Sequence, residues 1–108
     1  MSEIAIEPGS GNVYSDLGFS DAEEMLVKAQ LTARISEILA ERGWTQQHAG
    51  KVLGIPQPKL SKMLRGQFRG ISEAKMLDCL TRLGHNIQIV ISAYPEPASS
   101  GRIQVVSA

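Results

Sequence analysis

The chain of 108 residues carries 11 basic and 11 acidic side chains, so its formal net charge is zero, and 43% of its residues are hydrophobic. This length fits a single domain with a modest core, and the lone cysteine excludes a disulfide framework and a cysteine-based metal site. No apolar run approaches the ~20 residues of a membrane span and no signal peptide opens the chain, so we expect a cytoplasmic protein that does not enter a membrane.

The first segment of the chain is acidic. Residues 1–24 contain neither Lys nor Arg but six acidic side chains, which are Glu3, Glu7, Asp16, Asp21, Glu23 and Glu24. Residues 1–12 combine Pro, Gly and Ser with little apolar pattern, which predicts a flexible acidic arm.

A long helix is predicted to follow. Ser20 and Glu23 have the spacing of a capping box, in which two side chains satisfy free amides at a helix start. Gly43 is expected to end this helix at Arg42. Its core-facing stripe is predicted to be Leu31, Ile35, Ile38 and Leu39.

Residues 44–66, WTQQHAGKVLGIPQPKLSKMLRG, are the most informative stretch. Thr45 is a preferred N-cap residue, so a short helix is predicted to begin at Gln46. Gly50 lies on the inner side of this helix, where a close crossing needs a small residue. Gly54 is expected to form the turn, because Gly adopts a positive φ at little steric cost. The apolar stripe of this helix is predicted to be Ala49, Val52 and Leu53.

A second short helix is predicted directly after this turn. Ile55 is expected to be buried, Pro56 ends any continuation of the first helix, and Pro58 fits the first turn of the next, where its missing N–H costs nothing. The residues predicted to face the core are Leu60, Met63 and Leu64. The side chains left outside are Gln57, Lys59, Ser61, Lys62 and Arg65.

The last third of the chain changes its period. Ser72 is expected to cap a helix over residues 73–83, ended by Gly84. The inner face of that helix is predicted to be Ala74, Leu77, Leu80 and Leu83. Apolar residues then alternate over residues 86–94, which predicts a β-strand, and residues 102–107 are a candidate second strand. Because a lone hairpin is marginal in water, we expect it to pair with a second copy or to pack on its own helices.

These residues resemble the lambda-repressor-like, or XRE-type, helix-turn-helix family. The resemblance covers roughly residues 12–91 and extends to the compact HigA-type antitoxin and regulator proteins of bacteria. It implies a mainly α fold, a lambda-repressor-like bundle of four to five helices, with a DNA-binding domain at residues 13–84. A C-terminal β-strand or hairpin at residues 85–108, used in dimerisation, would follow. Pro56 departs from the family, which often has a capping side chain there.

The resemblance assigns the second motif helix to the DNA major groove, with its N-terminal end towards the base edges. The Gln57 amide can pair with adenine and Lys62 can reach guanine acceptors, whereas Lys59 is as well suited to phosphate. Gln46 resembles the phosphate-contacting Gln of the family. The full set of expected DNA contacts is Gln46, Gln57, Lys59, Ser61, Lys62, Arg65 and Arg69. For each of them the plainer alternative is a solvated surface side chain.

The charge distribution agrees with a face that meets phosphate. Residues 45–70 contain no acidic side chain but five basic ones, which are Lys51, Lys59, Lys62, Arg65 and Arg69. We therefore expect a sequence-specific transcriptional repressor that binds double-stranded DNA as a homodimer at a palindromic operator. The alternative is an antitoxin of a type II toxin–antitoxin pair, which neutralises a partner toxin and represses its own operon. No catalytic motif is present, so no enzyme activity, metal or cofactor is expected.

Overall fold

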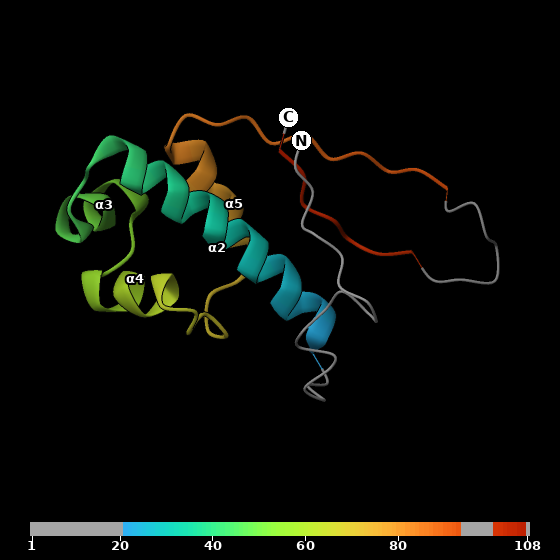
Figure 1. Ribbon diagram of the computed structural model, residues 1–108, viewed down its shortest axis with the longest axis horizontal. Helices are drawn as coiled ribbons and strands as arrows, with labels where there is room; N and C mark the ends of the chain where they lie inside the picture. The colour runs from blue at the N-terminus through green and yellow to red at the C-terminus, as the bar shows by residue number, and fades with distance from the viewer. Residues whose placement is uncertain (1–20, 94–100, 108) are drawn as a thin grey trace. The chain divides into compact units, whose positions relative to one another are not determined.

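The computed structural model describes residues 21–93 and 101–107 (Figure 1). Four helices occupy these residues: α2 (Ala22–Arg42), α3 (Gln46–Leu53), α4 (Gln57–Leu64) and α5 (Glu73–Arg82). The chain divides into two units, one formed by Lys28–Ile87 and the other by Met1–Val27 with Gln88–Ala108. The helical fold below is that of the first unit, and the predicted arm at residues 1–12 lies outside the described residues.

The ends of the helices follow local capping chemistry. Thr45 Oγ1 accepts a hydrogen bond from the His48 N–H at 3.1 Å, and Ser72 Oγ accepts one from the Lys75 N–H at 3.0 Å. Each bond satisfies an amide that has no partner within its own helix. The predicted starts of α3 and α5 are therefore confirmed. Ser20, the predicted cap of α2, lies outside the described residues.

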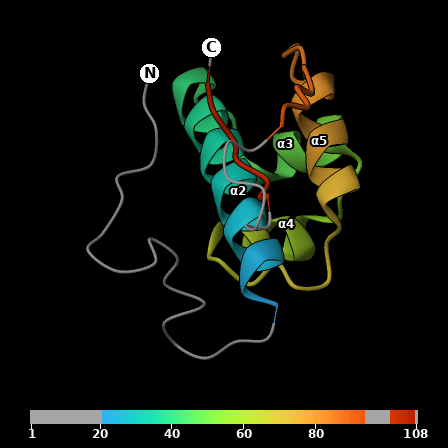
Figure 2. The ribbon, with the colours of Figure 1, turned by 90° about the vertical axis from the view of Figure 1, so that its right-hand side faces the viewer.

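The core lies between the helices. Figure 2 shows α2 and α5 on opposite sides of the bundle, with α3 and α4 between them. The predicted stripe of α2 is buried, as are the anchors expected on α3 and α4, although Val52 and Leu64 are only half-buried. The largest fully buried side chains are Ile35, Ile38, Leu53, Leu60, Met63, Met76, Leu83 and Cys79. A mainly helical, helix-turn-helix type of fold is thus confirmed.

The inner face of α5 differs from the prediction. Leu80 and Leu83 are buried as predicted, but Ala74 is exposed and Leu77 is half-buried, whereas Met76 and Cys79 are fully buried. Both sets of residues have helical spacing, so periodicity alone cannot choose between them. The choice is made by tertiary contacts, among them a hydrogen bond from Thr32 Oγ1 to the Met76 sulfur at 3.8 Å.

Helix α2 is also tied to the last third of this unit through polar contacts. The buried ammonium of Lys28 donates to the Arg69 carbonyl oxygen at 3.0 Å. Arg42 donates through Nη2 to the Leu83 carbonyl oxygen at the end of α5. Because these bonds join residues 41 positions apart, they fix α2 against the loop before α5 and against the end of α5.

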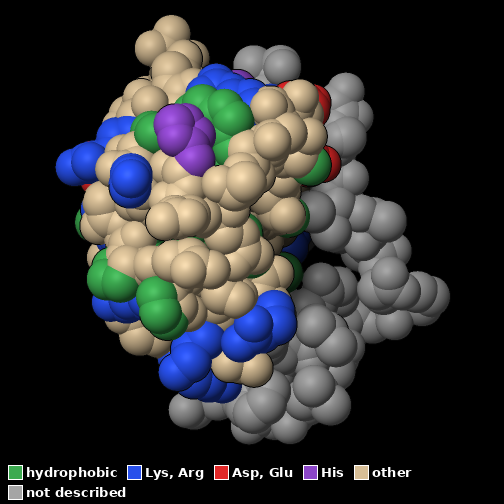
Figure 3. All heavy atoms as spheres, turned by 90° about the vertical axis from the view of Figure 1, so that its left-hand side faces the viewer, with side chains coloured by type: hydrophobic (Ala, Val, Ile, Leu, Met, Phe, Trp, Pro, Cys, Tyr) green, Lys and Arg blue, Asp and Glu red, His purple; other side chains and the backbone are tan. Residues whose placement is uncertain are grey.

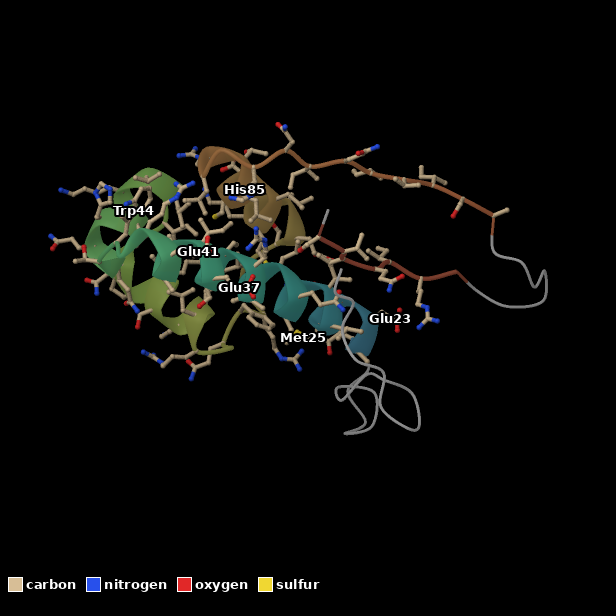
Figure 4. All side chains as sticks on the ribbon, turned by 45° about the horizontal axis from the view of Figure 1, so that its top comes forward. Glu23, Met25, Glu37, Glu41, Trp44 and His85 are labelled. Carbon is tan, nitrogen blue, oxygen red and sulfur yellow. The ribbon has the colours of Figure 1, made fainter. Side chains whose placement is uncertain are left out.

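The junction between α2 and α3 is organised around Trp44, which is half-buried. The Arg42 guanidinium lies 5.1 Å from the centre of its ring, and the His48 ring meets it edge-on with centroids 4.5 Å apart. Figure 4 shows Trp44 just beyond the end of α2, which carries Glu37 and Glu41 one turn apart. Acidic side chains thus occur on α2, whereas α3 and α4 carry basic side chains and no acidic ones.

The predicted C-terminal β-strand or hairpin is not found. Residues 86–93 and 101–107 contain no strand, and Figure 1 draws them as extended coil. Ile89, Val90 and Ile91 are 76%, 76% and 92% exposed. Alternating apolar residues favour an extended backbone, but a strand also needs a partner for its N–H and C=O groups. The residues that would join the two segments, 94–100, lie outside the described part.

Candidate nucleic-acid interface

Helix α4 has a buried side and an exposed side. Leu60 and Met63 are fully buried and anchor the helix on the core. Gln57, Lys59 and Lys62 are exposed, as the sequence predicted, so their amide and ammonium groups face solvent. The packing of α4 and its polar surface therefore involve separate sets of residues.

The turn between α3 and α4 is tight. Gly54 ends α3 in the left-handed conformation at φ 70°, and its N–H donates to the Gly50 carbonyl oxygen at 2.9 Å. Ile55 follows, 5% exposed, and its N–H bonds to the same oxygen at 3.1 Å. The predicted roles of Gly54 as turn residue and Ile55 as a buried plug are confirmed. Two amides sharing one carbonyl hold the chain in a fixed path from one helix to the next.

Helix α4 starts without a side-chain cap. Its N-cap is Pro56, whose ring offers no hydrogen-bond acceptor, and Pro58 lies in the first turn. Pro58 suits that place because it has no N–H to satisfy. The absence of a side-chain cap agrees with the departure from the family at Pro56. It lowers the local stability of the helix by about 1 kcal/mol. The free amides at this end of α4 therefore remain available to an external acceptor.

Ser61 and Arg65, one turn apart on α4, are brought together. The Arg65 guanidinium donates through Nη1 to Ser61 Oγ at 2.7 Å. Ser61 is half-buried and Arg65 is exposed. Both side chains were predicted as DNA contacts, and the Ser61 hydroxyl thus orients the Arg65 guanidinium.

The two remaining predicted contacts lie on either side of α4 in the chain. Gln46 is the exposed first residue of α3, in the turn whose N–H groups have no partner within the helix itself. Arg69 is exposed in the loop before α5, and the Lys28 ammonium holds its carbonyl oxygen. Both side chains therefore project from backbone that is fixed by the fold.

The outer surface around the turn is concave. Its lining joins residues of α3, the turn and the start of α4, namely Gln47, Gly50, Lys51, Gly54, Ile55, Pro56 and Gln57. Gln47 and Lys51 were not among the predicted contacts, and both are exposed. The helical spacing could have predicted that they lie on the outer side of α3, because it places them opposite the apolar stripe.

The end of the molecule that carries α3 and α4 is poor in acidic side chains. Figure 3 views this end and shows Lys and Arg side chains in several groups, with Asp and Glu side chains only at its edges. The sequence accounts for this, since residues 45–70 contain five basic and no acidic side chains. A surface of this sign attracts polyanions.

Sequence reasoning missed a group of charged residues on α5. Lys75 Nζ donates to the Leu53 carbonyl oxygen at 3.0 Å, and Arg82 Nη1 donates to the Val52 carbonyl oxygen at 3.3 Å. Asp78 bonds both cations, at 3.3 Å to Lys75 and 2.9 Å to Arg82. The hydrogen bond from Lys75, ahead of the charge of Arg82, lowers the pKa of the Asp78 carboxyl below its ordinary value.

The described residues show no metal or membrane element. Among them, no group of three or more His, Cys, Asp and Glu side chains is placed to hold a metal ion. No helix in the described part of the chain is both long and apolar enough to cross a membrane.

Comparisons with known proteins agree with this geometry. The profile of a family described as a helix-turn-helix domain matches residues 13–92. One solved structure, described as a candidate XRE family transcriptional regulator, is 32% identical to this chain and has a TM-score of 0.75. That match covers 82% of this chain and 99% of the other. No curated protein matches the chain at a significant level.

Proposed function

Because the chain belongs to the XRE-type helix-turn-helix family of DNA-binding transcription regulators, we propose that it is a sequence-specific repressor that acts without catalysis. The observation that carries the proposal is the two-sided character of α4. Leu60 and Met63 fix the helix from within, while Gln57 and Lys62 are exposed on the side away from the core. A rigid helix with polar side chains on its free side fits the DNA major groove.

In this mechanism α4 enters the groove with its N-terminal end towards the bases. Gln57 is the first residue of the helix, and its amide can both donate to and accept from adenine. Lys62 and Lys59 supply ammonium groups for guanine acceptors or phosphate. Gln46 and Arg69, which project from backbone on either side of α4, bind phosphate and set the register of the protein on the duplex.

We propose that the repressor binds as a homodimer. Helix α4 has 8 residues and is therefore roughly 12 Å long, enough to read only a few base pairs. A second copy doubles the site and makes the operator palindromic. The exposed apolar side chains of Ile89, Val90 and Ile91 support self-association, because a second copy could cover them.

The second candidate is the antitoxin role. Residues 1–24 carry six acidic and no basic side chains, a composition suited to a basic protein partner. Most of that segment lies outside the described residues. A small basic ribonuclease-like protein encoded beside this chain, inhibited on co-expression, would support this role. Full toxin activity in the presence of the chain would exclude it.

Selection of bound DNA from a random pool, at a fixed salt concentration, tests the repressor proposal. We expect enrichment of a two-fold symmetric sequence whose half-sites lie about one helical turn, roughly 10 base pairs, apart. The double variant Gln57→Ala, Lys62→Ala is the matched control and should lose the enrichment while remaining folded. A pool that stays random with the unaltered protein would overturn sequence-specific binding, and an unsymmetric enriched site would overturn the dimer.

A further inference from the structure

The C-terminal end of α3 is held by cations from another helix. Val52 and Leu53 are the last two residues of α3, so no N–H group of the helix donates a hydrogen bond to their carbonyl oxygens. Lys75 and Arg82 of α5 donate to these two oxygens at 3.0 and 3.3 Å. Their positive charge also complements the negative end of the α3 dipole. Helix α5 thus supplies from 22 and 30 residues away what the end of α3 lacks.

Asp78 joins the two cations into one unit. Lys75, Asp78 and Arg82 lie on the same side of α5, and Asp78 Oδ2 bonds Lys75 Nζ at 3.3 Å and Arg82 Nε at 2.9 Å. These side chains are 31%, 44% and 46% exposed, so solvent weakens each ion pair. The importance of the group is therefore geometric: it aims both cations at the carbonyl oxygens of α3.

The position of this group in the fold decides what it controls. Arg82 Nη1 lies 3.1 Å from the point where a Cβ on Gly54 would be, so the group sits against the turn itself. Helix α4 begins only three residues later, and its N-cap, Pro56, offers no side-chain hydrogen bond to the free amides of the first turn. The orientation of α4 at its start therefore depends on how the end of α3 and the turn are held.

We propose that Lys75 and Arg82 are positioning residues for DNA readout, which fix the turn between α3 and α4 and do not themselves contact DNA. This inference rests on the proposed function. Lys75 and Arg82 thus have a different role from Lys62 and Arg65, which are expected to contact DNA, although all four side chains are basic. The donors of Lys75 and Arg82 are directed to carbonyl oxygens of the protein itself. In this proposal the two side chains therefore affect DNA binding only through the position of α4.

A positioning residue and a phosphate contact have different signatures. Loss of a phosphate contact weakens binding to all DNA alike and flattens the dependence on salt. Loss of a positioning residue misplaces the base-reading side chains, so it lowers the ratio of operator to random DNA affinity. A merely destabilised protein has fewer folded molecules, which lowers both affinities by one factor and leaves that ratio unchanged.

The experiment compares Lys75→Met, Arg82→Met and the double variant with Arg34→Met. Arg34 pairs with Glu37 at 3.1 Å on α2, so its replacement also removes one positive charge and one ion pair, but within a single helix. Affinities for the selected operator and for random DNA are measured over a salt series. Hydrogen exchange is followed at the Gly54 and Ile55 amides, which bond to the Gly50 carbonyl oxygen.

We expect the affinity ratio to fall about 2- to 30-fold in the α5 variants, with the salt dependence of random DNA binding no flatter than in Arg34→Met. Exchange at the two amides should accelerate several-fold beyond that in Arg34→Met. Lys75→Arg, which keeps a donor, should recover much of the ratio. Ratios and exchange equal to those of Arg34→Met would overturn the proposal, and so would a flatter salt dependence, which marks a phosphate contact.

The two proposals fail in distinguishable ways. If the unaltered protein does not discriminate operator from random DNA, the proposed function fails and the readout part of the inference fails with it. Hydrogen exchange then decides whether Lys75 and Arg82 hold the turn, because it needs no DNA.

Discussion

The carbonyl oxygen of Ile55 lies 2.8 Å from the position that a Cβ on Gly50 would occupy. After the turn the backbone passes so close to α3 that any side chain at position 50 would clash with a backbone atom. A backbone atom cannot move aside as the end of a flexible side chain can. The sequence predicted a small residue here for the crossing of the second helix. The atom that requires a small residue is the Ile55 carbonyl oxygen, which belongs to the turn that precedes the second helix.

Gly50→Ala should destabilise the protein by about 1–2 kcal/mol. The gain from the better helix preference of Ala is about 1 kcal/mol, and overpacking against backbone outweighs it. Gly70→Ala is the control, since Gly70 has open space and no positive φ, and its effect should stay within about 0.5 kcal/mol. Thermal unfolding measures both. A Gly50→Ala protein as stable as the parent would show that the turn can open without penalty.

Gln57→Ala and Lys62→Ala should each weaken operator binding by about 1–3 kcal/mol and relax the base preference at one position per half-site. The reason is that each removes the donors or acceptors that read a base edge in the proposed complex, while the buried side of α4 is untouched. Competition binding with single-base operator variants measures the effect, and Arg34→Met controls for loss of charge. Unchanged discrimination in both variants would remove α4 from the groove.

Arg65→Ala should weaken binding to all DNA sequences about equally and lower the salt slope by about one. Because Ser61 Oγ accepts from the Arg65 guanidinium at 2.7 Å, Ser61→Ala should produce part of the same loss by freeing that guanidinium. In an Arg65→Ala background, Ser61→Ala should have no further effect on random DNA. A double-mutant cycle with strictly additive losses would show that the two side chains act independently.

Stability should fall in acid partly through Asp78. The neighbouring Lys75 hydrogen bond and the charge of Arg82 lower the pKa of this carboxyl in the folded protein. Such a carboxyl stabilises the fold at pH values above its ordinary pKa, and this contribution disappears as the pH falls through the lowered pKa. We expect the unfolding temperature to decline below about pH 4, and less steeply in Asp78→Asn. Parallel profiles for the two proteins would contradict this role.

Cys79 should resist thiol reagents in the folded protein. Its side chain is fully buried, and burial raises the pKa of the thiol, so little thiolate is present at neutral pH. A disulfide reagent should react at a rate limited by unfolding and much faster in denaturant. The rate in denaturant is the reference, and equal rates with and without denaturant would show that the thiol is accessible.

Much of the helical part could be predicted because its signals are local. Thr45 and Ser72 cap their helices through amides three residues away, and Gly54 turns the chain through its own φ. Such features depend on a few neighbouring residues and so can be recognised in a short window. The exposed side of α4 was predictable for the same reason, since its spacing separates Leu60 and Met63 from the polar residues.

The rest depends on contacts that spacing does not encode. Two apolar stripes compete on α5, and the packing of Met76 near Thr32 decides between them. The charges of Lys75, Asp78 and Arg82 could be placed on one side of α5, but their targets at the end of α3 could not be identified. The alternation in residues 86–94 indicates an extended backbone, whereas a strand requires a neighbour that these residues do not have within the described part of the chain.

The division of α4 into an anchoring side and a free side has a consequence for evolution and engineering. Gln57, Lys59 and Lys62 take no part in the packing of the core, so exchanging them leaves the interior of the protein as it is. Under the proposed mode of binding, a lineage or a combinatorial library can therefore explore new operators at these positions without rebuilding the scaffold, and duplicated copies of such a gene can diverge in target while remaining alike in shape.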